Sequence, residues 1–206
     1  MKINKLTTLL FASLSMGIFS SCVNDDDTVL PEYNALILGE NFSEGTSGSK
    51  FAYEGWTNYS EAGTRFWITE TFSGNGYAKF TSFPALPTYP AEASNIAWLI
   101  TPPIDLDAQE GEKLVFQAAQ AFVDNTANTL EVLISTNYDG ENVTAASWQT
   151  LNATLPTTAS VRYAFINSGV IDISRYTGKA YIAFRVKGNG TTLDGTYQID
   201  NVRVFN

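Results

Sequence analysis

From residue 35 to residue 206 the chain alternates short apolar segments with turn-forming segments, and this pattern constrains the fold more than any other feature. The apolar segments are rich in β-branched and aromatic residues, which favour strands, and the Gly, Pro, Asn and Asp between them favour turns. Alternation is clear at Leu130, Val132 and Ile134, and no long segment keeps a helical period. The pattern predicts an all-β, antiparallel jelly-roll β-sandwich rather than a barrel. The segments with strand composition are 35–39, 77–83, 97–101, 113–123, 129–136, 161–173, 179–188 and 196–205.

The last of these segments changes phase in its middle. Tyr197 and Ile199 share one face of an alternating strand, whereas Val202 and Val204 have the opposite parity. The change falls on Asp200 and its neighbour, where one extra residue would restore the core face. We therefore predict a β-bulge at Asp200.

The first 21 residues have the pattern of a secretory signal peptide. A basic start with Lys2 and Lys5 precedes an apolar stretch that is too short to span a membrane. The only cysteine, Cys22, follows in the sequence FSSC, which resembles the lipobox of bacterial lipoproteins. The resemblance implies that lipid on Cys22 anchors the protein. The alternative is an ordinary signal peptide followed by an incidental cysteine.

Residues 22–34 read as an acidic tether between this cysteine and a single domain at 35–206. The run Asp25 to Asp27 is similar to the export signal of surface lipoproteins in Bacteroidota, which implies an outer-membrane protein exposed at the cell surface. Thr28 matches a short O-glycosylation motif of the same phylum. The alternative is a solvated linker with no signal in it.

Charge excludes one class of partner. All 21 acidic residues lie beyond Cys22, whereas two of the 12 basic residues precede it, so the chain after Cys22 carries a net charge near −11. Such a surface repels nucleic acid phosphates. It is compatible with neutral glycans, proteins and divalent cations.

Residue types argue against catalysis. The chain has no histidine and one cysteine, so histidine-based triads and zinc sites are absent. No phosphate-binding loop or dinucleotide fingerprint is present. We expect no enzymatic activity, although a hydrolase with two paired carboxylates stays open as an alternative.

Aromatic residues make up 13% of the chain, and four of them lie in polar or proline-rich stretches. Trp56, Tyr59, Tyr89 and Trp148 are candidate ligand-binding residues, because flat rings beside polar groups suit sugar rings. The alternative is that these rings fill the sandwich or anchor its loops.

Several phrases occur in the order found in one known family. These phrases are WTNYSEAGTRFW, NIAWLITPPIDL, LEVLISTNYDG, ASWQTL, SGVIDISRYTGKAYIAFRVKG and TYQIDNVRV. Residues 35–206 thereby resemble the choice-of-anchor J family, which is related to cleaved-adhesin and MAM-like jelly rolls. The resemblance implies a surface jelly roll, similar to galactose-binding and carbohydrate-binding modules and commonly stabilised by calcium. It implies no activity.

The resemblance also implies where calcium would bind. Glu40 and Asp200 match the carboxylates that the family brings together from its first and last strands, and Asn41, Glu44 and Asn95 are weaker candidate ligands. Calcium takes six to eight oxygen ligands, including backbone carbonyls. The alternative is that Asp200 faces solvent beside a bulge and Glu40 is an unrelated surface charge.

These features leave two main functions. The first is a non-catalytic surface lipoprotein that binds carbohydrate, held to the membrane only through its lipid and stabilised by structural calcium. The second is an adhesin-like or structural domain whose partner is a host or bacterial protein.

Overall fold

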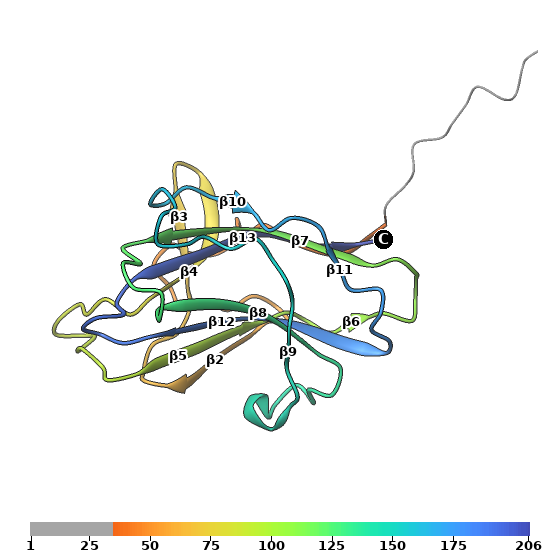
Figure 1. Cartoon of the computed structure of the whole chain (residues 1–206), viewed down its shortest axis with the longest axis horizontal. Helices are drawn as coiled ribbons and strands as arrows, with labels where there is room; N and C mark the ends of the chain where they lie inside the picture. Colours follow the sequence, from red (N-terminus) through yellow and green to blue (C-terminus); the bar gives the residue numbers. More distant parts are fainter. Residues whose placement is uncertain (1–34) are drawn as a thin grey trace, which may run out of the picture. The chain divides into compact units, whose positions relative to one another are not determined.

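A computed structural model describes residues 35–206, which form two β-sheets packed face to face (Figure 1). The predicted signal peptide 1–21 and tether 22–34, with Cys22 and Thr28, lie outside the described residues. Every strand pairing is antiparallel. The predicted jelly-roll β-sandwich is therefore confirmed.

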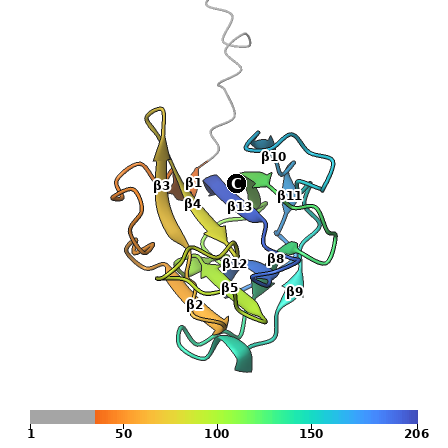
Figure 2. The same cartoon turned by 90° about the vertical axis from the view of Figure 1, so that its left-hand side faces the viewer.

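The seven-stranded sheet carries the order β10-β7-β13-β4-β3, with β1 also on β13 and β11 also on β7. The six-stranded sheet carries the order β2-β5-β12-β8-β9, with β6 also on β12. Figure 2 views the two layers from one end. The strands are β1 (Leu36–Glu40), β2 (Thr57–Ala62), β3 (Ile68–Phe72), β4 (Asn75–Thr81), β5 (Asn95–Ile100), β6 (Ile104–Asp105), β7 (Lys113–Ala121), β8 (Thr129–Ser135), β9 (Gln149–Thr150), β10 (Ile166–Asn167), β11 (Ile171–Asp172), β12 (Lys179–Gly188) and β13 (Thr196–Phe205).

The main core lies between the sheets and follows the period of two. Leu130, Val132 and Ile134 of β8 all point into it, as the alternation predicts. Leu133 points the other way, into a smaller cluster on the outer face of the six-stranded sheet that also contains Trp98. A strand with apolar residues on both faces therefore has both faces covered. The helical content of the described residues is one short 3-10 turn at Val143–Ala145. No helix within residues 35–206 is long and apolar enough to cross a bilayer.

Cross-strand ion pairs stabilise the centre of the six-stranded sheet. Glu131 of β8 lies opposite Arg185 of β12, and its carboxylate accepts a hydrogen bond of 2.7 Å from that guanidinium. The ammonium of Lys187 lies 3.1 Å from the same carboxylate. Burial alone would raise the pKa of Glu131, but the hydrogen bonds and charges of Arg185 and Lys187 outweigh it and lower the pKa. The pair therefore favours the ionised carboxylate.

The predicted bulge occurs in β13. Asp200 pairs with Gln117 of β7 and Arg203 pairs with Val115, so one extra residue of β13 lies between the two pairs. Asn201 takes the left-handed backbone with φ of 50°, and its side chain donates a 2.9 Å hydrogen bond to Gln117. The extra residue lets both halves of β13 direct their apolar side chains into the core.

The prediction for residues 161–173 is wrong as a single strand. Only β10 and β11 form there, two residues each, because Tyr163 and Gly169 have positive φ and turn the chain. Val161 and Val170 are consequently 75% and 66% exposed rather than buried. Only the end of the segment reaches the core, through Ile171 and Ile173.

Four strands lie outside the predicted segments, namely the two-residue strands β6 and β9 and the longer strands β2 and β3. β2 and β3 have mostly polar sequences, and each lies at an edge of its sheet. An edge strand has one neighbour and packs less of its surface, so it tolerates polar residues that hide it from a search for apolar runs.

Candidate functional site

A groove of about 780 Å³ lies on the outer face of the seven-stranded sheet. Its floor is made by side chains of β3, β4 and β13 that alternate with core residues, namely Ile68, Lys79, Thr81 and Thr196. Its walls come from loops that lie far apart in the sequence. The wall residues are Gly48, Lys50, Arg65, Phe66, Phe83, Ala85, Tyr89, Phe122, Asp124, Tyr163 and Asp194.

The walls carry five aromatic rings that remain accessible. Phe83 is 60% exposed, and the other four rings are between 37% and 53% exposed. Isolated exposed aromatic residues need no explanation, but five around one hollow indicate a binding surface. Flat rings of this kind stack on the C–H faces of sugars or pack against apolar side chains of a protein.

Two of these rings are held by an unusual backbone. Phe122 and Tyr163 have backbone φ angles of 58° and 63°, which residues other than glycine rarely adopt. Their rings meet edge to face with centroids 6.0 Å apart. Gln120 is 2% exposed and fixes both loops: its carbonyl accepts a 2.7 Å bond from the Tyr163 amide, and its side chain bonds Ser160 and Val123 at 2.8 and 3.1 Å. A backbone strain of about 1–3 kcal/mol per residue persists only where the surroundings enforce it, and such strain clusters at functional sites.

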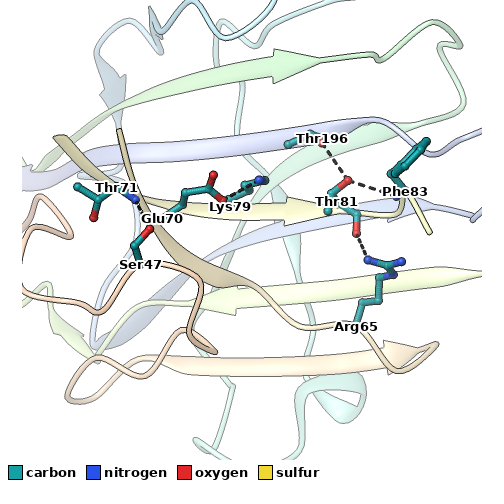
Figure 3. Close-up of polar contacts among 8 residues, drawn as sticks. All are labelled: Ser47, Arg65, Glu70, Thr71, Lys79, Thr81, Phe83 and Thr196. Carbon is teal, nitrogen blue, oxygen red and sulfur yellow. Dashed lines mark hydrogen bonds and ion pairs between the residues drawn. The ribbon is translucent and has the colours of Figure 1, made fainter. Parts of the chain in front are cut away.

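The floor of the groove is a hydrogen-bonded strip centred on Thr81 (Figure 3). The Thr196 hydroxyl donates to the Thr81 hydroxyl at 2.9 Å, and the Phe83 amide donates to the same oxygen at 3.2 Å. Lys79 lies beside Thr81 on the floor, and its ammonium forms a 2.6 Å ion pair with Glu70. The centre of the groove is thus polar while its walls are aromatic, which suits an amphipathic ligand such as a sugar.

Arg65 is the buried charge of this site. The residue is 6% exposed, and its Nη1 donates to the Thr81 carbonyl at 3.3 Å. The Tyr89 ring lies over its guanidinium with the centroid 4.7 Å away. Burial lowers the pKa of Arg65, while the negative charge of Glu92 acts in the opposite direction. The guanidinium remains a cation, because arginine does not lose its proton in proteins.

Of the four predicted ligand-binding residues, Tyr89 lines the groove and the other three lie elsewhere. Trp56 packs against the main core. Tyr59 and Trp148 pack into the outer cluster of the six-stranded sheet, where Trp148 lies 5.3 Å from Trp98. The alternative interpretation, in which rings fill the sandwich or anchor loops, describes these three positions.

Sequence reasoning missed Arg65, Phe83, Phe122 and Tyr163. Strand alternation offers no signal for them, because they lie in loops that meet only after the strands have paired. Tyr163 was also hidden inside the segment that was predicted as a continuous strand.

The two main calcium candidates, Glu40 and Asp200, lie on the paired strands β1 and β13. Glu40 at the end of β1 pairs with Val202 of β13, two residues beyond Asp200. Asp200 is 1% exposed, so the alternative in which it faces solvent is wrong. Its carboxylate accepts a 2.9 Å bond from Asn75, and Glu40 accepts a 2.9 Å bond from the Phe42 amide. Burial raises the pKa of Asp200, while hydrogen bonds from Asn75 and the next amide act against it.

The weaker calcium candidates are divided. Asn41 and Glu44 follow β1 and are exposed, with the Asn41 side chain accepting a 3.2 Å bond from the Ser43 amide. Asn95 lies in β5 of the other sheet, opposite Gly188, and is not brought together with the β1 and β13 residues. No group of three or more His, Cys, Asp or Glu residues suited to a metal occurs in the described part of the chain. Calcium at Glu40 would therefore need carbonyl and amide oxygens as well.

Comparison with known proteins supports the fold alone. No protein-family model and no curated protein matches this chain. Among solved structures, the K1 cleaved adhesin domain of Lys-gingipain from Porphyromonas gingivalis W83 is 22% identical, with 81% of this chain and 96% of that domain covered and a TM-score of 0.51. The K3 cleaved adhesin domain of the same protein is 19% identical over 84% of this chain and 100% of that domain, with a TM-score of 0.50. The carbohydrate-binding module TmCBM27, described for mannan recognition, covers 84% of this chain at 18% identity with a TM-score of 0.49.

Proposed function

We propose that this protein is a non-catalytic carbohydrate-binding module that captures glycans at the surface of a bacterial cell. The observation that carries the proposal is the groove, in which five exposed aromatic rings surround a polar floor. The rings would stack on sugar faces, while Thr81, Thr196 and Lys79 would bond to hydroxyl groups. The likeness to cleaved adhesin domains agrees with a binding role on the same fold.

The sequence supports the cellular side of the proposal. Cys22 in its lipobox-like setting would carry the lipid, and the acidic residues that follow would direct export to the outer surface. The membrane would then be contacted through acyl chains, leaving the groove free for a glycan. Membership of the choice-of-anchor J family is part of the same proposal and rests on the phrases quoted above.

Calcium would act as a structural clamp in this protein. Asp200 is a buried carboxylate that makes no ion pair among residues 35–206, and each of its oxygens accepts one hydrogen bond. Each carboxylate oxygen can accept more than one partner, so the residue fits a cation ligand. Glu40 and Asp200 would supply charge to the ion, which would tie the first strand to the last.

The experiment for glycan binding is an array of glycans probed with the full-length protein in detergent, followed by calorimetry on the hits. Phe83→Ala and Phe122→Ala should each weaken binding roughly tenfold, because a stacked ring contributes about 1–1.5 kcal/mol. The matched control is Phe72→Ala, since Phe72 is 73% exposed but does not line the groove. Unchanged binding in both groove variants, or equal loss in the control, would remove the groove from the proposal.

An adhesin-like domain with a protein partner is the second candidate. It is favoured by exposed apolar side chains in the loop after β4, where Phe83 and Leu86 are 60% and 79% exposed. Such side chains suit an apolar protein patch as well as a sugar. Host-matrix proteins on the same array distinguish the two functions, because binding to a protein with no glycan bound would favour this candidate.

A further inference from the structure

The groove gathers positive charge on a chain that is otherwise acidic. Beyond Cys22 the chain has 10 basic and 21 acidic residues, yet the groove is lined by three basic residues and two acidic ones. Lys50, Arg65 and Lys79 lie on the side of β3 and β4, whereas Asp124 and Asp194 come from loops beside β7 and β13. One side of the groove is therefore cationic within a negative surface.

The three cations differ in how well they are neutralised. Lys79 is paired with Glu70 at 2.6 Å. Lys50 is exposed, and its ammonium lies 3.6 Å from the centroid of the Phe66 ring. Arg65 makes no ion pair among the described residues, and its Nε and Nη2 atoms are buried without a hydrogen-bond partner.

The carboxylate of Glu92, whose charge acts on Arg65, is already engaged. Both carboxylate oxygens of Glu92 accept from the Thr64 amide, at 2.9 and 3.0 Å, and one also accepts from the Thr64 hydroxyl at 2.8 Å. A buried guanidinium normally has its donors satisfied, and unsatisfied donors at such depth call for a partner. A ligand anion in the groove is such a partner.

We propose that the groove selects a saccharide that carries an anionic group, a carboxylate or a sulfate ester, with Arg65 as its fixed ligand and Lys50 as an accessible second cation. The inference rests on the proposed glycan-binding function and names its ligand class. The planar guanidinium presents Nε and Nη2 side by side, which matches the two oxygens of a carboxylate or sulfate. The Tyr89 ring packs against the guanidinium, with its centroid 4.7 Å from Cζ, and is 40% exposed, so its rotation would admit the anion while the ring stays beside the sugar.

The acidic wall restricts the ligand further. Asp194 would repel a densely charged polymer lying along the whole groove, and Asp124 would add to this repulsion in part, because it forms a 3.5 Å ion pair with Arg162. A saccharide with one acidic residue at the Arg65 side and neutral residues elsewhere fits both walls. Nucleic acid, with a charge at every phosphate, would be repelled by the acidic wall and by the net charge of the chain.

The test is calorimetry with matched pairs of ligands that differ only in charge. A galactan oligosaccharide that carries a single galacturonate residue is compared with its methyl ester, and one that carries a single sulfate ester with its desulfated product, using full-length protein in detergent. The anionic member of at least one pair should bind ten- to one-hundredfold more tightly, which corresponds to the roughly 1.5–3 kcal/mol of a charge-assisted hydrogen bond. The pair that responds identifies carboxylate or sulfate as the source.

Variants locate the effect. Arg65→Gln should abolish the preference for the anion, so that the charged and neutral members of the responding pair bind with equal affinity. Lys50→Gln should reduce the preference in part, and it serves as the second variant because Lys50 is exposed and its replacement leaves the core intact. The control is Arg203→Gln, which removes the same charge from an exposed position of the same sheet outside the groove.

Failure of this inference is separable from failure of the proposed function. Equal binding of charged and neutral members by the unmodified protein overturns the anionic preference while glycan binding stands. A preference that survives in both Arg65→Gln and Lys50→Gln also overturns it. Absence of binding to every glycan on the array overturns the proposed function itself.

Discussion

Replacing Arg65 by methionine should leave the protein as stable as before or make it more stable. Arg65 is 6% exposed, and its Nε and Nη2 atoms are buried with no hydrogen-bond partner in the described part of the chain. Most substitutions of buried residues destabilise a protein, so the expected sign is unusual. The expected sign is unusual because the guanidinium of Arg65 serves to bind a ligand and contributes little to the stability of the fold.

The magnitude follows from the contacts that the substitution removes. Each unsatisfied buried donor costs about 1–3 kcal/mol, so the two together cost about 2–6 kcal/mol that methionine does not incur. Methionine loses the 3.3 Å bond to Thr81 and the cation–π contact with Tyr89, which contribute about 1 kcal/mol each. The net change in the free energy of unfolding is therefore a gain of between zero and about 4 kcal/mol.

Arg185 provides the matched control. Its guanidinium also lies 4.7 Å from an aromatic centroid, that of Trp98, but it is paired with Glu131 at 2.7 Å. Arg185→Met loses the ring contact and the ion pair with no compensating gain, so the free energy of unfolding should fall by about 1–2 kcal/mol. Arg65 and Arg185 thus share the ring geometry and differ in the carboxylate partner.

The assay is urea denaturation of both variants, supported by thermal melts in which 1 kcal/mol shifts Tm by about 2–4 °C at this chain length. A fall of more than 2 kcal/mol for Arg65→Met, equal to or larger than that of Arg185→Met, would refute the reasoning. The guanidinium would then be satisfied in the folded protein, and the basis for an anionic ligand would disappear.

Three further predictions concern the fold and its proposed calcium. Gly76→Ala should lower the free energy of unfolding by more than about 2 kcal/mol in urea titrations, because a Cβ atom at position 76 would meet the backbone carbonyl of Phe42; an unchanged midpoint would contradict this close approach. The pKa of Glu131 lies below its ordinary value of 4.5, so its contribution to stability is complete above pH 4.5 and is lost as the pH falls through the folded-state value. Urea titrations from pH 6 to pH 3 should show this loss in the unmodified protein and a smaller loss in Arg185→Met, and parallel curves would argue against it. Removal of calcium by a chelator should lower Tm by several degrees, Asp200→Ala should lower it similarly, and the chelator should then have little further effect on the variant; a Tm that ignores the chelator would exclude the clamp.

Most core strands of this fold can be predicted because the direction of a side chain in a strand depends on neighbouring residues of the sequence alone. Leu130, Val132 and Ile134 reach the core because side-chain direction in a strand depends only on residue parity. The bulge in β13 was readable for the same reason, since Val202 and Val204 reach the core only if an extra residue is inserted at Asp200. Edge strands such as β2 carried no such signal because their burial is incomplete.

Tyr89 is the only groove residue that the sequence predicted to bind a ligand. Arg65 and Tyr163 lie almost a hundred residues apart, and nothing in either local sequence indicates that they line the same hollow. Tyr163 reaches it because the backbone of Gln120 holds the Tyr163 amide at 2.7 Å. That contact exists only after β7, β10 and β13 have paired.

The sequence by itself therefore determined the layered all-β architecture, the phase break of the last strand and the acidic balance of the chain. These properties depend on the period of two and on composition, both of which are local. Only the tertiary structure decided that loops from six parts of the chain converge on one face and leave Arg65 buried against Tyr89 with no ion pair among residues 35–206. Strand pairing determines which loops lie side by side. The burial and the charge of the groove depend on several of these loops together, so no single segment of the sequence indicates them.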